Sequence, residues 1–132
     1  MGIQRMTIDE AQASPAANPI FVGEVVSQHL VPEGVADLLR VTAVTFRNGA
    51  RNRRHTHSTD QVLVATSGEG FVACDNKTLT LRSGDVAFIE RNTPHWHGAN
   101  PNQDFTHLSI LTPGHMEIQD DSSTAEPGEP AS

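Results

Sequence analysis

A series of short apolar, β-branched segments separated by turn residues is the feature that most constrains the fold of this chain. Gly, Pro, Asn, Asp and Ser fill the gaps between the segments, as they do in tight turns. No segment keeps a 3.6-residue period, and only residues 7–13 could form a helical turn. Many short strands with regular turns predict an all-β fold, either a sandwich or a barrel. The predicted strands are residues 20–26, 38–46, 61–66, 70–74, 79–81, 85–90 and 104–111.

The length of 132 residues predicts a single domain with one core. Residues 1–18 contain few apolar side chains and are expected to form an N-terminal arm that lies along a partner subunit. Residues 19–114 are expected to form the folded β domain. Residues 115–132 hold five acids and no Lys or Arg, and we expect them to be a disordered acidic tail. This tail accounts for most of the net charge of −7.

Composition also excludes several classes of protein. The basic side chains cluster only at Arg51, Arg53 and Arg54, which is too few for the basic stripe of a nucleic-acid-binding surface. No apolar run approaches the roughly 20 residues of a membrane span, and the first residues show no signal peptide. We therefore expect a cytoplasmic protein with no nucleic-acid or membrane partner. The single cysteine, Cys74, excludes a disulfide framework.

A His-x-His pair at His55 and His57 is followed four residues later by Gln61. Alternate residues of a strand share a face, so the two imidazoles point the same way from positions about 7 Å apart along the backbone. Both can then reach one ion with bonds of about 2 Å. Gln61 follows a short turn, so its amide oxygen can reach the same ion.

A second His-x-His pair, His95 and His97, lies in the segment "GDVAFIERNTPHWHGA". A single strand histidine is more often a hydrogen-bonded structural residue than a ligand. Two such pairs with several predicted strands between them favour a metal site instead, with His95 as the further ligand.

These residues resemble the two motifs of the cupin family. The first motif is Gly, five residues, His-x-His, three or four residues, Glu, six residues and Gly, and here Gln replaces the Glu. The second motif begins at Gly84 and supplies its histidine at His95. This chain departs from that motif at residues 90–92, where the motif has a turn, and at Ala99, where it has a strand end. The positions that match the first motif are Gly49, His55, His57, Gln61 and Gly68.

The resemblance implies a double-stranded β-helix, the jelly-roll barrel of cupins, that is usually dimeric. It also implies one divalent metal bound by His55, His57, Gln61 and His95. Together the stretches around these residues and "FTHLSI" are similar to small manganese-dependent cupins that include bacterial hydroxynitrile lyases. In that group further histidines lie beside the metal, and His97 and His107 occupy the matching positions.

The glutamine has a chemical consequence for such a site. A neutral amide leaves the charge of a divalent ion uncompensated, which makes the ion a stronger Lewis acid. The same neutral ligand stabilises oxidised metal states less well, which favours polarising a substrate oxygen over activating O₂. Imidazole and amide ligands suit Mn, Fe, Co, Ni or Zn, and the resemblance favours Mn.

Other polar residues receive less specific interpretations. His107 and His97 are candidates for a catalytic base or for hydrogen-bonding support of the site. Arg51 and Arg53 alternate with His55 and could contact an anionic substrate, although a solvated rim or a subunit ion pair is the commoner role. The remaining expectations are that His29 and His115 are solvated and that Trp96 points outward.

Three functions fit these features, all with a small-molecule substrate. The first is a metal-dependent lyase of hydroxynitrile-lyase type, in which the metal acts as Lewis acid and a histidine as base. The second is a metal-dependent oxygenase, and the third is a non-catalytic or sugar-handling cupin. A homodimer is expected because Leu108 and Ile110 would point outward if His107 points inward.

Overall fold

The computed structural model describes residues 2–119 and is almost entirely β. One 3₁₀ turn, η1 (Glu10–Gln12), precedes the strands and confirms the predicted helical turn. No helix among these residues is long and apolar enough to span a membrane. The strands are β1 (Ser14–Pro15), β2 (Phe21–Val22), β3 (Val25–Val31), β4 (Arg40–Phe46), β5 (Arg51–Asn52), β6 (His55–His57), β7 (Gln61–Cys74), β8 (Lys77–Arg82), β9 (Val86–Ile89), β10 (His95–Ala99), β11 (Phe105–Leu111) and β12 (Met116–Ile118).

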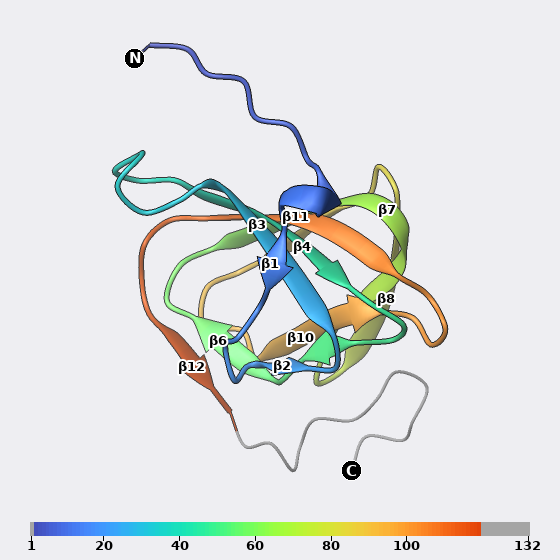
Figure 1. Cartoon of the computed structure of the whole chain (residues 1–132). Helices are drawn as coiled ribbons and strands as arrows, with labels where there is room; N and C mark the ends of the chain where they lie inside the picture. Colours follow the sequence, from blue (N-terminus) through green and yellow to red (C-terminus); the bar gives the residue numbers. More distant parts are fainter. Residues whose placement is uncertain (1, 120–132) are drawn as a thin grey trace.

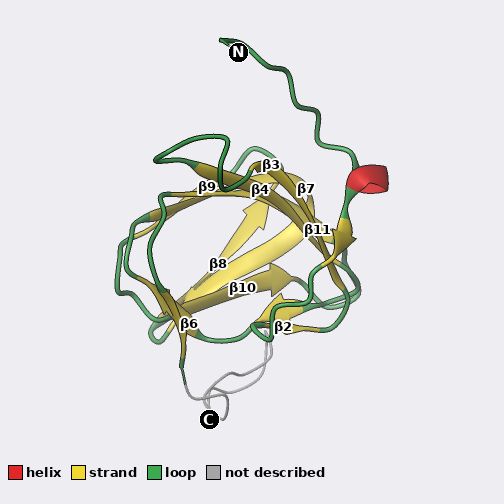
Figure 2. Ribbon diagram, turned by 60° about the vertical axis from the view of Figure 1, so that its left-hand side comes forward, coloured by secondary structure: helices red, strands yellow, loops and turns green. Residues whose placement is uncertain are grey.

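The strands form two antiparallel sheets that curl around a common interior (Figures 1 and 2). The first sheet has the order β1-β3-β4-β11-β7-β9, and the second contains β2, β5, β10, β7 and β8, with β6 beside β10 and β12 beside β6. Strand β7 belongs to both sheets, because its first half pairs with β11 and β9 and its second half with β10 and β8. The predicted barrel of the cupin type is confirmed.

The long strand β7 differs from the prediction, which gave two separate strands at residues 61–66 and 70–74. The chain bends between these segments without leaving the sheet. Gly68 has a φ of +77°, and a Cβ at this position would overlap the carbonyl oxygen of Asp104. The register between β7 and β11 also shifts next to His107, which is a β-bulge that sharpens the local twist. The bend and the bulge carry β7 from one sheet into the other.

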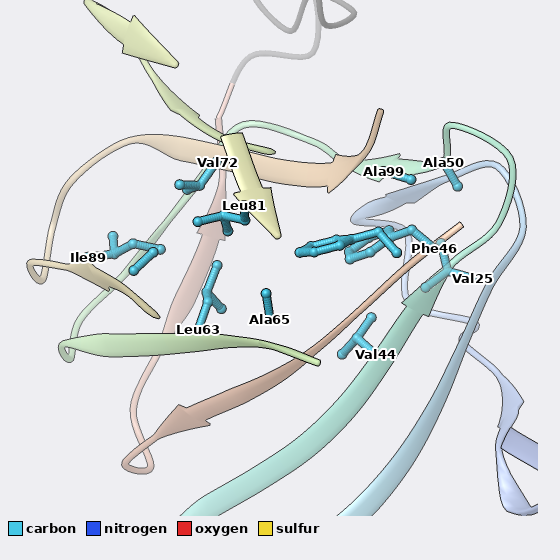
Figure 3. Packing of buried hydrophobic residues seen from close by; sticks show 12 residues of the cluster. Val25, Val44, Phe46, Ala50, Leu63, Ala65, Val72, Leu81, Ile89 and Ala99 are labelled. Atoms are coloured by element: carbon cyan, nitrogen blue, oxygen red, sulfur yellow. The ribbon is translucent and has the colours of Figure 1, made fainter. Parts of the chain in front are cut away.

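The apolar core fills the interior between the two sheets (Figure 3). Phe46, Leu63 and Phe105 are completely buried there, with Val72 and Leu81 packed between them. The ring of Phe46 lies 5.5 Å from that of His107 and 5.9 Å from that of His97, between ring centroids. The core residue Phe46 therefore packs against two of the candidate site residues.

Both ends of the chain contribute more structure than we expected. Ser14–Pro15 pairs with β3, and the side chain of Gln28 bonds to the backbone at Thr7 and Asp9, so the arm packs on its own chain. Beyond residue 114, where we expected the folded domain to end, β12 pairs with β6. These short strands are held by backbone hydrogen bonds, which hydrophobic patterning does not reveal. Most of the predicted tail, residues 120–132, lies outside the described residues.

Candidate metal centre

His55 and His57 occupy β6, and Gln61 begins β7 after a short turn. His55 and Gln61 are buried, whereas His57 is half-buried. The ring centroids of His55 and His57 are 4.9 Å apart. The alternation of β6 therefore places both rings on the inner face, as the sequence predicts.

His95 joins them from the neighbouring strand. It lies directly opposite His55 across the pairing of β6 with β10, and their ring centroids are 4.3 Å apart. The ring of His57 is 5.7 Å away from that of His95. The four residues that the sequence predicts as ligands come from three strands, and their three imidazoles form one cluster.

Backbone carbonyls orient two of these imidazoles. Nδ1 of His55 lies 2.7 Å from the carbonyl oxygen of Arg53, and Nδ1 of His95 lies 2.8 Å from that of Thr93. A carbonyl oxygen only accepts hydrogen bonds, so both Nδ1 atoms carry the proton. The Nε2 lone pair of each ring then remains free, which is the arrangement found in metal-binding histidines.

Two buried polar atoms of the cluster lack a hydrogen-bond partner among the described residues: Oε1 of Gln61 and Nε2 of His95. The amide nitrogen of Gln61 donates to Oγ of Ser109 at 2.8 Å, which fixes Oε1 as the free end. An unpaired buried acceptor costs about 1–3 kcal/mol. A cation is a partner that both an amide oxygen and an imidazole nitrogen accept, so the chemistry of this donor set fits a bound metal.

Burial also keeps the imidazoles neutral. It is the main cause that lowers the pKa of His57 to about 4 and the pKa values of His55 and His95 below their ordinary range. The neighbouring His95 lowers the pKa of His55 and of His57 further. Neutral imidazoles offer the lone pairs that metal binding requires.

His97 lies close enough to belong to the same cluster. One nitrogen of each of His55, His95 and His97 lies within 4.8 Å of the others, so these three also form a possible metal-binding group. Both ring nitrogens of His97 already have neighbours, however. Nδ1 is 3.1 Å from Nε2 of His107, and Nε2 is 3.1 Å from the amide nitrogen of Asn52. His95 belongs to both candidate groups, and the unpaired Oε1 atom of Gln61 favours Gln61 over His97 as a further ligand.

His97 and His107 form a buried pair beside the cluster. Burial lowers the pKa of His107 to about 4 and that of His97 well below its ordinary range, which His107 lowers further. Asn52 accepts a hydrogen bond from the backbone N–H of His97 at 2.8 Å and holds its amide nitrogen against the ring. The pair is therefore neutral and fixed in position.

A cavity of about 500 Å³ opens onto this group. His55, His57, Gln61, His97 and His107 line its inner end. Residues 15–18 of the N-terminal segment line another part, so this segment helps to enclose the cavity of its own chain. No Asp, Glu, Lys or Arg side chain lines the cavity within the described residues.

Arg51 and Arg53 do not line this cavity, although strand alternation predicted that they share a face with His55. Strand β5 ends at Asn52 and β6 begins at His55, so the chain breaks between them and the alternation does not carry through. Asn52 shares the inner face with the histidines, whereas Arg53 donates to the carbonyl oxygen of Pro19. Arg54 pairs with Asp75.

Sequence reasoning missed Asn52 and Ser109, which hold His97 and Gln61 in place. Ser109 alternates with His107 on β11, so strand periodicity could have found it. His29 is exposed as expected, but it also lines the cavity. Trp96 faces away from the histidines and is buried against Phe71.

The chain has clear relatives among known proteins. Residues 42–111 match the Cupin domain family. The (R)-mandelonitrile lyase of Granulicella tundricola is 33% identical over 111 residues, which cover 83% of each protein. Acireductone dioxygenase 1 of Pectobacterium atrosepticum is 38% identical over 64 residues, 46% of this chain and 37% of that relative.

Solved structures show the same fold. A cupin-like protein from Thermotoga maritima has a TM-score of 0.80 and 32% identity, covering 89% of this chain and 96% of the other. The polyketide cyclase RemF from Streptomyces resistomycificus has a TM-score of 0.75 at 15% identity, covering 89% of each chain. The family match, the identity to the lyase and the barrel agree, and this chain belongs to the cupin family.

Proposed function

We propose that this cupin is a metal-dependent lyase of the hydroxynitrile type, which cleaves a cyanohydrin into a carbonyl compound and hydrogen cyanide. The observation that carries the proposal is the pair of buried, unpaired atoms that two of the proposed ligands present, Oε1 of Gln61 and Nε2 of His95. A relative that is 33% identical over 83% of the chain is a mandelonitrile lyase, which supports the same chemistry.

One divalent transition metal per chain would be held by His55, His57, Gln61 and His95. Manganese is our first candidate, and Fe, Ni, Co and Zn also suit imidazole and amide donors. When bound, such an ion supplies a Lewis acid that polarises the hydroxyl oxygen of the substrate. Ser109 and the carbonyl groups of Arg53 and Thr93 hold three of these side chains in place.

The proton of the substrate hydroxyl passes to the pair formed by His97 and His107. Nδ1 of His97 and Nε2 of His107 face each other, and Nε2 of His97 lies against the amide nitrogen of Asn52, so Nδ1 of His107 is the ring nitrogen of the pair that has no partner among the described residues. As the O–H bond breaks, the carbonyl bond forms and the C–C bond gives its electron pair to cyanide. Cyanide then takes the proton from the imidazolium and leaves as hydrogen cyanide.

The uncharged cavity favours this reaction over the alternatives. Among the described residues its lining contains no Asp, Glu, Lys or Arg side chain to bind an ionised substrate, and Gln61 adds no charge to the donor set. A neutral cyanohydrin suits such a cavity. The likeness to acireductone dioxygenases makes a metal-dependent oxygenase the second candidate, although the match spans only 37% of the dioxygenase. The third candidate is a non-catalytic or sugar-handling metal-binding cupin.

Turnover of mandelonitrile under nitrogen and under air separates these candidates. A lyase releases cyanide and benzaldehyde at the same rate in both atmospheres. An oxygenase requires O₂, and a binding protein releases neither product.

We also propose that the protein works as a cytoplasmic homodimer. The outer face of the first sheet carries apolar rows, in which Val62 lies opposite both Phe88 and Ile110, and Val64 opposite both Val86 and Leu108. Phe88 is 65% and Val86 is 62% exposed. A second copy of the chain would cover this face, because an uncharged apolar surface can pack against itself.

A further inference from the structure

The mouth of the cavity has one polar wall, formed by strands β3 and β4. His29 and Thr42 face each other across the pairing of these strands, and both line the cavity. Nδ1 of His29 lies 3.2 Å from Oγ1 of Thr42, and this is the only hydrogen bond that its side chain makes within residues 2–119. The bond orients the imidazole and leaves its Nε2 atom without a partner.

His29 lies two strands away from Ser109, which holds one of the proposed metal ligands. Thr42 is also opposite Ser109 on β11, and Ser109 accepts the hydrogen bond from Gln61. Neighbouring strands are about 4.8 Å apart, so the backbones of His29 and Ser109 are separated by about 10 Å. A benzene ring with a substituent at each end is of comparable length.

Apolar side chains make up much of the remaining cavity wall, which also includes Asn18, Ser27 and Asn52. Ile20 and Phe21 from the N-terminal side, with Met116 and Leu111, line it alongside Val44. A substrate held between these groups would meet hydrogen-bonding partners at its two ends and hydrocarbon between them. Such a division is typical of pockets that select their ligand by a few placed polar groups.

We propose that His29, positioned by Thr42, is a specificity-determining residue that binds a hydroxyl group on the end of the substrate remote from the metal centre. The substrate class is a neutral aromatic cyanohydrin or carbonyl compound with a hydroxyl group opposite its reacting carbon. A hydroxyl both donates and accepts, so it can pair with Nε2 in either neutral tautomer of the ring. This inference rests on the proposed function, since it assigns the other end of the substrate to the metal centre.

Binding of two unreactive alcohols tests this inference without requiring turnover. 4-Hydroxybenzyl alcohol and 4-methylbenzyl alcohol have nearly the same size, and only the first carries the remote hydroxyl. Calorimetric titration of the manganese-loaded protein should show that the hydroxy compound binds about three- to tenfold more tightly, the range for one neutral hydrogen bond. His29→Ala should abolish this preference, and His29→Gln should retain part of it.

The matched control is His115→Ala, because His115 is also exposed but lies outside the cavity lining. It should keep the wild-type preference, and all variants should keep their manganese. Equal binding of the two alcohols to the wild-type protein would overturn the inference, as would an undiminished preference in His29→Ala. A preference that depends on His29 in a protein that releases no cyanide would support the inference while refuting the lyase function.

Discussion

Nε2 of His107 lies 3.1 Å from Nδ1 of His97, and the two imidazoles are buried against the core. At this distance only one of the two facing nitrogens can carry a proton, so a single hydrogen atom lies between them. The contact between the facing atoms couples the two rings, so uptake of a proton by one ring depends on the other. The two residues should therefore act as one base.

Replacing His107 with alanine should lower kcat for cyanide release by roughly 10²- to 10⁴-fold, the usual contribution of a general base. The manganese content should remain that of the wild-type protein, because His107 is not a proposed ligand. The double variant with His97→Ala should be little slower than the single variant, since the two rings form one unit. Wild-type kcat in metal-loaded His107→Ala protein would show that this pair is not the base.

The choice of ligands can be tested by metal analysis of four alanine variants. His55→Ala, His57→Ala and His95→Ala should each lose most of their manganese, because each removes one proposed donor. His97→Ala should retain it, because both ring nitrogens of His97 have other neighbours. Loss of metal from His97→Ala with full retention in His57→Ala would instead support the group formed by His55, His95 and His97.

Replacing Gln61 with glutamate adds a negative charge beside the ion with almost no change in side-chain length. The variant should bind manganese at least as tightly, but the ion should polarise the substrate oxygen less. A shift of one pKa unit in the substrate hydroxyl corresponds to about 1.4 kcal/mol, so cyanide release should slow by roughly tenfold. Rates must be compared at equal metal occupancy. A fully loaded Gln61→Glu protein that turns over as fast as wild type would mean that the neutral amide does not set the chemistry.

The proposed dimer can be tested by light scattering at micromolar concentration. The mass should be twice the chain mass of 14.2 kDa. Phe88→Lys should shift the protein toward the monomer, because it places a charge in the proposed interface, whereas Lys77→Ala should have no effect. A wild-type mass near that of one chain would rule out the dimer.

Much of the architecture could be predicted because strand alternation and turn residues are local properties. The same alternation placed His55 with His57 and His95 with His97 on the inner face. It failed between Asn52 and His55, where the strand breaks and the face changes. A break of this kind is set by contacts with distant strands, so the inward position of Asn52 could not be read from its neighbours in sequence.

The N-terminal segment was harder to predict for a different reason. Residues 15–18 are small or polar and show no amphipathic pattern, yet they line the cavity. They reach it because the backbone of Ser14–Pro15 pairs with β3 and Gln28 anchors the preceding residues. Backbone pairing leaves no pattern in the side chains. The sequence therefore did not reveal that this segment lines part of the cavity.

Cyanide release from mandelonitrile under nitrogen, followed as manganese is added to metal-free protein, tests the proposed function most directly. We expect no release without metal and a rate that rises in proportion to occupancy up to one ion per chain. The rate under air should be the same. Absence of cyanide at full occupancy, or release that requires O₂, would contradict the assignment of this cupin as a metal-dependent hydroxynitrile lyase.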